Sequence, residues 1–435
     1  MNALWSTAAR VVTLVVSLIC GVLSARLVIT EAGVEHYAFL SLLVAIPGLI
    51  TFSDLGTGAA IVNALAESDD PRSDELLRRK TRSVMRIMAG TAGVLATLNL
   101  VLLLTDGWSV LLGGGAEGIE NASLAAFCCT AVLCLTICLG IWQRVLLGLG
   151  RNPIIILLQG LISPVSLLIV WLLLGTGFDG VRPFLAIGSF AATLLVAVLG
   201  FLVAVRLTGP LLPESLRALP FPRRHPGARV MDVGWPMLAQ MLTGPLAMTA
   251  PRYILAFSAS SLAIAQYGVA GQVFFALQSL VSATGVALWP RFAAQRRAGR
   301  IRGGPFLFGA VFGALLAIAT LMILLVGPWL FGLIADDHVP ITAGIILSFG
   351  TMVTLQAVLY PLGMFMMDAP GLRFQVLPSL LMAVSTVGLT FALVPLLSVC
   401  APPLANAASV LLFQIIPYGV YIRRHRARLY GAPAA

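Results

Sequence analysis

Stretches of about 20 mostly apolar residues recur along the whole 435-residue chain. Each is long enough to cross the hydrocarbon core of a bilayer, about 30 Å thick, as an α-helix. Because backbone groups in lipid must be hydrogen-bonded internally, a run of such stretches can fold only as a helical bundle. We count twelve predicted spans, at 7–29, 37–63, 84–105, 122–146, 153–175, 183–205, 233–257, 264–289, 305–326, 341–366, 375–397 and 402–422. The sequence therefore predicts an all-α integral membrane protein with twelve transmembrane helices.

Composition and charge place this bundle in the membrane with a defined orientation. With 59% hydrophobic residues, 10% charged residues and a mean hydropathy of +0.99, the chain is far more apolar than soluble domains. The net charge of +10 alone could suggest a nucleic-acid partner, but basic residues beside membrane helices usually mark cytoplasmic loops. If the N-terminus lies in the cytoplasm, 24 of the 27 Lys and Arg residues fall in inner segments, and only Arg182 lies in an outer loop. We therefore predict a multi-pass protein with both termini cytoplasmic and no nucleic-acid partner, and we interpret the first span as a retained helix.

The longest inner loop, 207–232, divides the predicted spans into six and six. It is rich in Pro and Arg and reads "GPLLPESLRALPFPRRHPGAR" near its start. An even number of spans in each half makes the halves parallel repeats, and transporters commonly bind substrate between such repeats. The predicted organisation is an N-terminal six-helix bundle at 1–206, a cytoplasmic linker at 207–232, and a C-terminal six-helix bundle with a short basic tail at 233–435.

Apart from the arginines at the cytoplasmic ends of spans, which are counted above with the inner segments, three charged residues lie within predicted spans, where a charge is costly and usually functional. Arg26 and Arg252 occupy corresponding helices of the two halves, and we expect them to face one central cavity and bind an anionic group. The alternative is that both side chains reach the interface, where Arg26 could also meet Glu31. Asp54, in "FSDLGTGAAI", is predicted to couple cargo or proton binding to bundle closure; alternatively, it caps a resumed half-helix.

Amide side chains within the spans offer neutral hydrogen bonds. Gln240 and Gln278 are candidate sugar-binding residues, with Gln272 nearby in the same class. Amides in the middle of a membrane also tie helices together. Both roles stay open at this stage.

Several short motifs resemble the polysaccharide flippases of the superfamily that also contains multidrug exporters and the lipid II flippase. They are the Gly33 to Tyr37 spacing, the "DLG" at 54–56, "QRVLLGLGRN" at 143–152 and "ALWPRFA" at 287–293. The resemblance implies a V-shaped, alternating-access transporter built from the two bundles in a bacterial inner membrane. It further implies a polyprenyl-pyrophosphate-linked oligosaccharide as cargo, membrane lipids as surroundings, and a polysaccharide polymerase and other export proteins as partners. Arginine suits such a cargo, because its planar fork matches phosphate oxygens.

Other function classes fit the sequence less well. A multidrug or cation antiporter of the same superfamily is the main alternative, but it would need several cavity carboxylates where this chain offers one against two arginines. An enzyme would need a catalytic constellation on a substantial loop, and the longest outer loop, 106–121, contains none. The cysteines at 128–138 have no His or carboxylate beside them within the span, and the G-x-G-x-x-G at 113–118 lies in an outer loop, away from any strand. We expect no enzyme activity, no metal and no cofactor.

Overall fold

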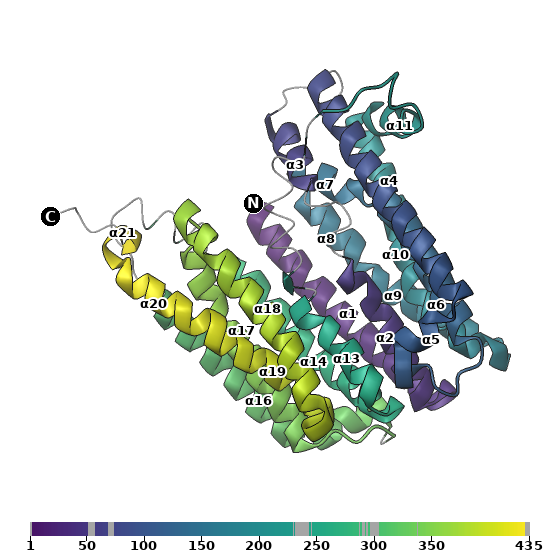
Figure 1. The fold of residues 1–435 in the computed structure, drawn as a ribbon, viewed down its shortest axis with the longest axis vertical. Coiled ribbons are helices and arrows are strands. Elements are labelled where there is room, and N and C mark those ends of the chain that lie inside the picture. The colour runs from purple at the N-terminus through teal and green to yellow at the C-terminus, as the bar shows by residue number, and fades with distance from the viewer. Residues whose placement is uncertain are drawn as a thin grey trace. The chain divides into compact units, whose positions relative to one another are not determined.

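The computed structural model describes residues 2–50, 57–67, 74–228, 230, 243–244, 246–286, 288, 292, 295, 304–336 and 338–430. No β-strand occurs in this part of the chain. Nine of its helical stretches are long and apolar enough to cross a membrane. The chain divides into two compact units, Met1–Leu242 and Thr243–Ala435, each of which is a helical bundle (Figure 1). The predicted all-α, multi-pass fold is thereby confirmed.

The nine stretches correspond to the predicted spans with simple adjustments. The predicted spans 375–397 and 402–422 form one continuous apolar stretch, Pro370–Arg424. The predicted spans 37–63 and 233–257 both contain residues outside the described part of the chain. The predicted linker, 207–232, belongs to the first compact unit.

Unit 1 consists of long helices, several of which continue into a second segment after a short break. The helix α1 packs against α2, α8 and α9, and α10 packs against α6, α7 and α9. Breaks occur at Gly140, between α6 and α7, and at Leu161, between α8 and α9. The helices are α1 (Asn2–Ala32), α2 (Val34–Leu49), α3 (Gly58–Glu67), α4 (Glu75–Leu104), α5 (Gly107–Leu112), α6 (Ala122–Leu139), α7 (Ile141–Gly148), α8 (Asn152–Gly160), α9 (Ile162–Leu174), α10 (Ile187–Thr208) and α11 (Leu211–Arg217).

A glycine allows a buried tryptophan of unit 1 to pack between helices. Trp142 of α7 is 2% exposed, and its ring lies where a side chain on Gly200 of α10 would otherwise stand. Membrane helices gain little from apolar burial alone, because lipid is equally apolar, so close contact at small residues carries much of their association. This contact fixes α7 against α10.

Unit 1 contains a compact polar turn after the C-terminal end of α4. Asp106 accepts hydrogen bonds from the Ser123 hydroxyl (2.7 Å) and the Ser109 hydroxyl (2.8 Å). These two hydrogen bonds stabilise the ionised carboxylate and lower the pKa of Asp106. The turn thereby joins the end of α4 to the start of α6.

Unit 2 is a second bundle, in which α17 packs against α14, α16 and α19. Its α16–α17 interface relies on small residues: Gly309 and Gly313 of α16 lie against Val358, and Gly350 of α17 lies against Thr320. The helices are α13 (Ala250–Ser258), α14 (Ser261–Val286), α16 (Pro305–Ala335), α17 (Ala343–Phe365), α18 (Ala369–Leu397), α19 (Ala401–Val410), α20 (Ile416–Arg424) and α21 (Arg426–Tyr430).

A π-helical segment, Leu411–Ile415, joins α19 to α20. Pro417 follows it and has no N–H to donate to the preceding turn, while its ring would clash with the carbonyl four residues earlier in a regular α-helix. The wider π turn accommodates this proline without ending the helix. The last span of the chain is therefore continuous but locally irregular.

Candidate functional site

The central feature of unit 2 is an arginine held against an aromatic ring. Arg252 lies in the first turn of α13 and is half-buried. Its guanidinium carbon lies 5.6 Å from the ring centroid of Tyr267, on α14. Its Nε–H is buried and donates to no described residue, and no ion pair forms between Arg252 and a described carboxylate. The cation is thus positioned by a ring face, and no carboxylate of the described residues pairs with the N–H edges of the guanidinium.

A cluster of aromatic rings fixes the position of Tyr267. This side chain is 3% exposed, and its ring lies 5.0 Å from Phe349 and 6.3 Å from Phe275. Phe349, on α17, also stacks on Phe274 at 5.7 Å with an interplanar angle of 24°. Tilted and offset ring pairs at these distances are favourable arrangements. The ring beneath Arg252 is consequently a rigid platform built by α14 and α17.

A chain of amide hydrogen bonds crosses the same unit. Gln278 donates to the Gln356 carbonyl oxygen (3.0 Å), and Gln356 donates to the Asn406 carbonyl oxygen (2.9 Å). Asn406 is 1% exposed and donates to the backbone carbonyl of Ala247 at 3.1 Å. The amides therefore connect α14, α17 and α19 to the segment that precedes α13. The chain begins at the side-chain nitrogen of Gln278, and the side-chain oxygen of Gln278 has no partner among the described residues.

The platform and the amide chain share one interface. Gln278 follows Tyr267 by eleven residues, which is about three helical turns, so both side chains lie on the same face of α14. Gln356 follows Phe349 by seven residues, about two turns, and shares its face of α17. The Arg252 cation and the neutral amides therefore lie on the same interface of unit 2, separated by two to three helical turns along α14 and α17.

The structure describes three of the five predicted site residues. Arg252 and Gln278 lie in the interface just described, although Gln278 is also engaged in a tie between helices. Arg26 lies in α1 of unit 1, where it is half-buried and its backbone carbonyl accepts a hydrogen bond from Thr30 (2.9 Å). Asp54 and Gln240 lie outside the described residues. The roles predicted for all five residues remain predictions.

Sequence reasoning missed two members of the amide chain. Gln356 and Asn406 are polar residues inside apolar spans, and that position was a usable signal. However, Gln356 is 78 residues from its partner Gln278 and 50 residues from its partner Asn406, so the pairing depends on how the helices pack.

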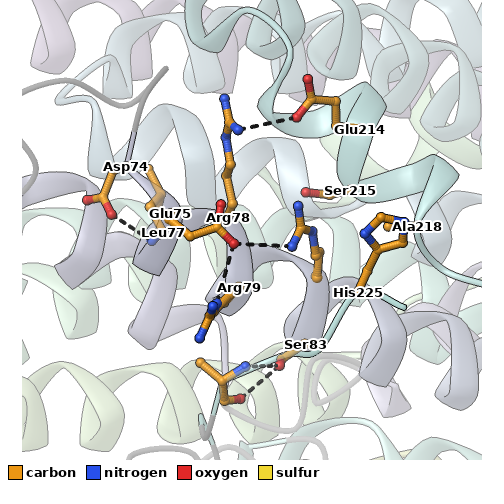
Figure 2. A network of polar contacts seen from close by, with 12 residues as sticks. Asp74, Glu75, Leu77, Arg78, Arg79, Ser83, Glu214, Ser215, Ala218 and His225 are labelled. Carbon is orange, nitrogen blue, oxygen red and sulfur yellow. Dashed lines mark hydrogen bonds and ion pairs between the residues drawn. The ribbon is translucent and has the colours of Figure 1, made fainter. Parts of the chain in front are cut away.

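A second polar cluster lies at the basic end of unit 1 and fastens the predicted linker to α4 (Figure 2). Arg86 donates from one Nη2 to the backbone carbonyls of Ala218 (3.0 Å) and His225 (2.8 Å). The Ser83 hydroxyl donates to the carbonyl of Ala228 (2.8 Å) and accepts from the N–H of the same residue (2.9 Å). We call these contacts of Ser83 and Arg86 with residues 218–228 the linker clasp.

Ion pairs and apolar burial support the linker clasp. Arg78 pairs with Glu214 of α11 at 3.7 Å, and Leu211 and Leu212 of α11 are fully buried. At the start of α4, the Asp74 carboxylate accepts a hydrogen bond from the N–H of Leu77 (3.0 Å), as an N-cap does. Residues 211–228 are accordingly a docked part of unit 1, and they do not behave as a free tether.

Comparisons with known proteins relate this architecture to membrane transporters. The sequence profile of a family described as "Polysaccharide biosynthesis protein" matches residues 1–295. The chain is similar to the lipid II flippase MurJ in an inward closed conformation, with a TM-score of 0.70 and 12% identity over 96% of this chain and 87% of that one. It is similar to an inward-facing multidrug resistance MATE family transporter of the MOP superfamily, with a TM-score of 0.67 and 14% identity over 100% of both chains.

The chain also resembles the Vibrio cholerae MATE transporter VcmN in its bent form, with a TM-score of 0.55 and 15% identity over 99% of this chain and 98% of that one. No curated protein sequence matches it. At identities this low, the structural similarities establish a shared fold.

Proposed function

The chain belongs to the polysaccharide biosynthesis protein family, as its motifs predicted, and on that premise we propose that it is a flippase for a polyprenyl-pyrophosphate-linked oligosaccharide. It would carry this cargo across the bacterial cytoplasmic membrane for export of a surface polysaccharide. The basic loops would lie in the cytoplasm together with both termini. A polysaccharide polymerase and other export proteins are the partners that this role implies.

The observation that carries the proposal is the state of Arg252. A guanidinium inside a membrane protein is costly and is normally paired or functional. Here its plane is held by Tyr267, and no described carboxylate neutralises it. A pyrophosphate would supply the missing anion, because Arg binds phosphate oxygens through two parallel N–H bonds. Arg26 is the corresponding candidate in unit 1.

The distribution of charge favours an anionic cargo over a cationic drug. The described carboxylates lie at the ends of the predicted spans or outside them, as Glu31, Glu75 and Asp368 illustrate. A cation antiporter would instead be expected to carry several carboxylates along its pathway. Asp54 is the one carboxylate predicted within a span, and one acid against two arginines suits a phosphate ligand better.

Neutral amides two to three helical turns from the arginine, on the same interface, suit the sugar part of the cargo. The carbonyl oxygen of Gln278 can accept a hydrogen bond from a sugar hydroxyl while its amide nitrogen remains bonded to Gln356. An acceptor held in place by the amide chain loses little rotamer freedom on binding, which improves affinity.

Translocation in reconstituted vesicles tests the proposal. Wild-type protein should move a fluorescent polyprenyl-pyrophosphate oligosaccharide between leaflets, and Arg252→Ala should abolish this movement. Arg252→Lys should restore it only in part, since Lys provides a point charge without the planar fork. Tyr267→Phe should retain activity because the ring face remains. Tyr267→Leu should lose about 2- to 30-fold, the range equivalent to ~0.5–2 kcal/mol of cation–π interaction.

The matched control is Arg182→Ala, which removes an arginine that is paired with Asp179 at 2.9 Å and lies in a predicted outer loop. This variant should translocate cargo at the wild-type rate. Normal translocation by a folded Arg252→Ala would refute the proposed role of that residue.

A further inference from the structure

A groove on the surface of unit 2 combines an apolar wall with a cationic end. It has a volume of about 550 Å³ and is lined by Phe374 of α18, by five residues of α20, and by the residue that follows α20. The α20 residues are Ile416, Pro417, Val420, Tyr421 and Arg424, and the following residue is His425. This volume lies within the range of about 300–1,000 Å³ that is typical of ligand pockets. The groove lies apart from the interface that contains Arg252.

The spacing of the lining residues orders the groove along α20. Ile416, Val420 and Arg424 recur every four residues, so they form one stripe on the helix surface. From Ile416 to Arg424 the stripe is about 12 Å long, at 1.5 Å per residue. Ile416 is 50% exposed and Val420 is 44% exposed, and both fall within the last predicted span. The stripe therefore runs from an apolar membrane-depth surface to a guanidinium at the interface.

A stack of rings forms the adjoining wall. Phe374 and Tyr421 are stacked with centroids 4.2 Å apart and an angle of 20°, and Tyr421 lies 4.2 Å from the ring of His425. The Nδ1 of His425 is 3.0 Å from the carbonyl oxygen of Tyr421, which can only accept, so Nδ1 carries the proton of this hydrogen bond. The wall is thus rigid, and Nε2 of His425 remains for an external partner.

The charge around the groove selects an anion. The nearest carboxylate in sequence is Asp368, which precedes α18 and does not line the groove. From residue 369 to residue 430 the sequence contains no Asp or Glu, and Arg373, Arg424 and Arg426 are exposed. Arg423, next in the chain to Arg424, is directed elsewhere: its guanidinium lies 5.6 Å from the ring of Phe306. Arg424 is the arginine that lines the groove.

We propose that this groove binds one anionic phospholipid of the leaflet on the side of the basic loops, with an acyl chain along Ile416 and Val420 and the headgroup phosphate at Arg424. Basic pockets beside membrane helices on the cytoplasmic side are known positions for anionic headgroups. An acidic protein segment fits less well, because most of the lining surface is apolar and lies at membrane depth. The site is independent of the cargo site and of the proposed flippase activity.

Native mass spectrometry of the full-length protein in detergent tests the site by titration with phosphatidylglycerol and, separately, phosphatidylcholine. The wild type should bind phosphatidylglycerol more tightly. Arg424→Gln should weaken that binding about fivefold, the factor equivalent to ~1 kcal/mol for one basic residue at an anionic membrane surface. Arg423→Gln, which removes the same charge one residue away, should not. Val420→Trp, which fills the groove without a change of charge, should weaken binding of both lipids.

Three outcomes would overturn the proposal. Equal losses in the Arg424 and Arg423 variants would mean diffuse attraction to a basic tail. Displacement of the lipid by millimolar inorganic phosphate would mean that the apolar wall contributes nothing. Binding of a polyprenyl phosphate in place of phosphatidylglycerol would assign the groove to the cargo.

Discussion

Replacing Arg86 by Gln should release the linker clasp while the helical bundle stays folded. The side chain makes two charge-assisted hydrogen bonds, at 3.0 Å to Ala218 and 2.8 Å to His225. A hydrogen bond to a charged group contributes about 1.5–3 kcal/mol. The bond to His225 is exposed, so water can replace it and its contribution belongs at the low end. We therefore expect local opening of residues 218–228 to become easier by roughly 2–4 kcal/mol.

Hydrogen–deuterium exchange measures this opening directly. A change of about 2 kcal/mol corresponds to a roughly 30-fold faster exchange of the amides in 218–228, including that of Ala228, which is bonded to Ser83. The control is Arg79→Gln: Arg79 is on the same helix, but its exposed pair with Glu75 at 3.4 Å is worth only about 0.3–0.5 kcal/mol. Unchanged exchange in Arg86→Gln, or an equal effect of Arg79→Gln, would refute the assignment of the clasp to these hydrogen bonds.

Three other predictions concern topology, coupling and the amide chain. A reporter at Glu117 should be external and one at the C-terminus cytoplasmic; a cytoplasmic signal at Glu117 would contradict the twelve-span topology. Asp54→Asn should fold and insert normally but lose transport or its pH dependence, whereas normal transport together with misfolding of Asp54→Ala would make the carboxylate a helix cap. Gln356→Leu should destabilise unit 2 by roughly 1–3 kcal/mol, since it removes bonds to Gln278 and Asn406 that average about 0.6 kcal/mol in membranes and leaves buried amides unpaired. If the variant and the wild type have the same free energy of unfolding in denaturant, the amide chain does not stabilise unit 2 as proposed.

The architecture was predictable because lipid imposes it. A span needs only length and apolar composition, so ranges such as 122–146 and 305–326 matched observed helices without knowledge of packing. The breaks within the helices were harder to predict from the sequence. The π segment before Pro417 follows from the proline, but the break between α6 and α7 has no comparably strong signal.

The site was only partly predictable because its geometry depends on contacts between distant segments. Arg252 stood out as a charge in an apolar run, yet its position over the Tyr267 ring required the packing of α13 against α14. The docking of the linker was not predicted. Its Pro and Arg content marked the division between the two sets of spans, while Leu211 and Leu212, which are fully buried, were the signal that part of it packs against unit 1.

The most direct measurement of the central claim is a comparison of two cargoes in the same vesicles. Wild-type protein is reconstituted, and translocation is followed for a polyprenyl-pyrophosphate oligosaccharide and for a lipophilic cation of the kind that multidrug exporters carry. With arginine as the prominent charge at the candidate site, the account predicts movement of the anionic lipid-linked cargo above the protein-free background and no movement of the cation. Transport of the cation without transport of the lipid-linked oligosaccharide would contradict the account and support the antiporter alternative.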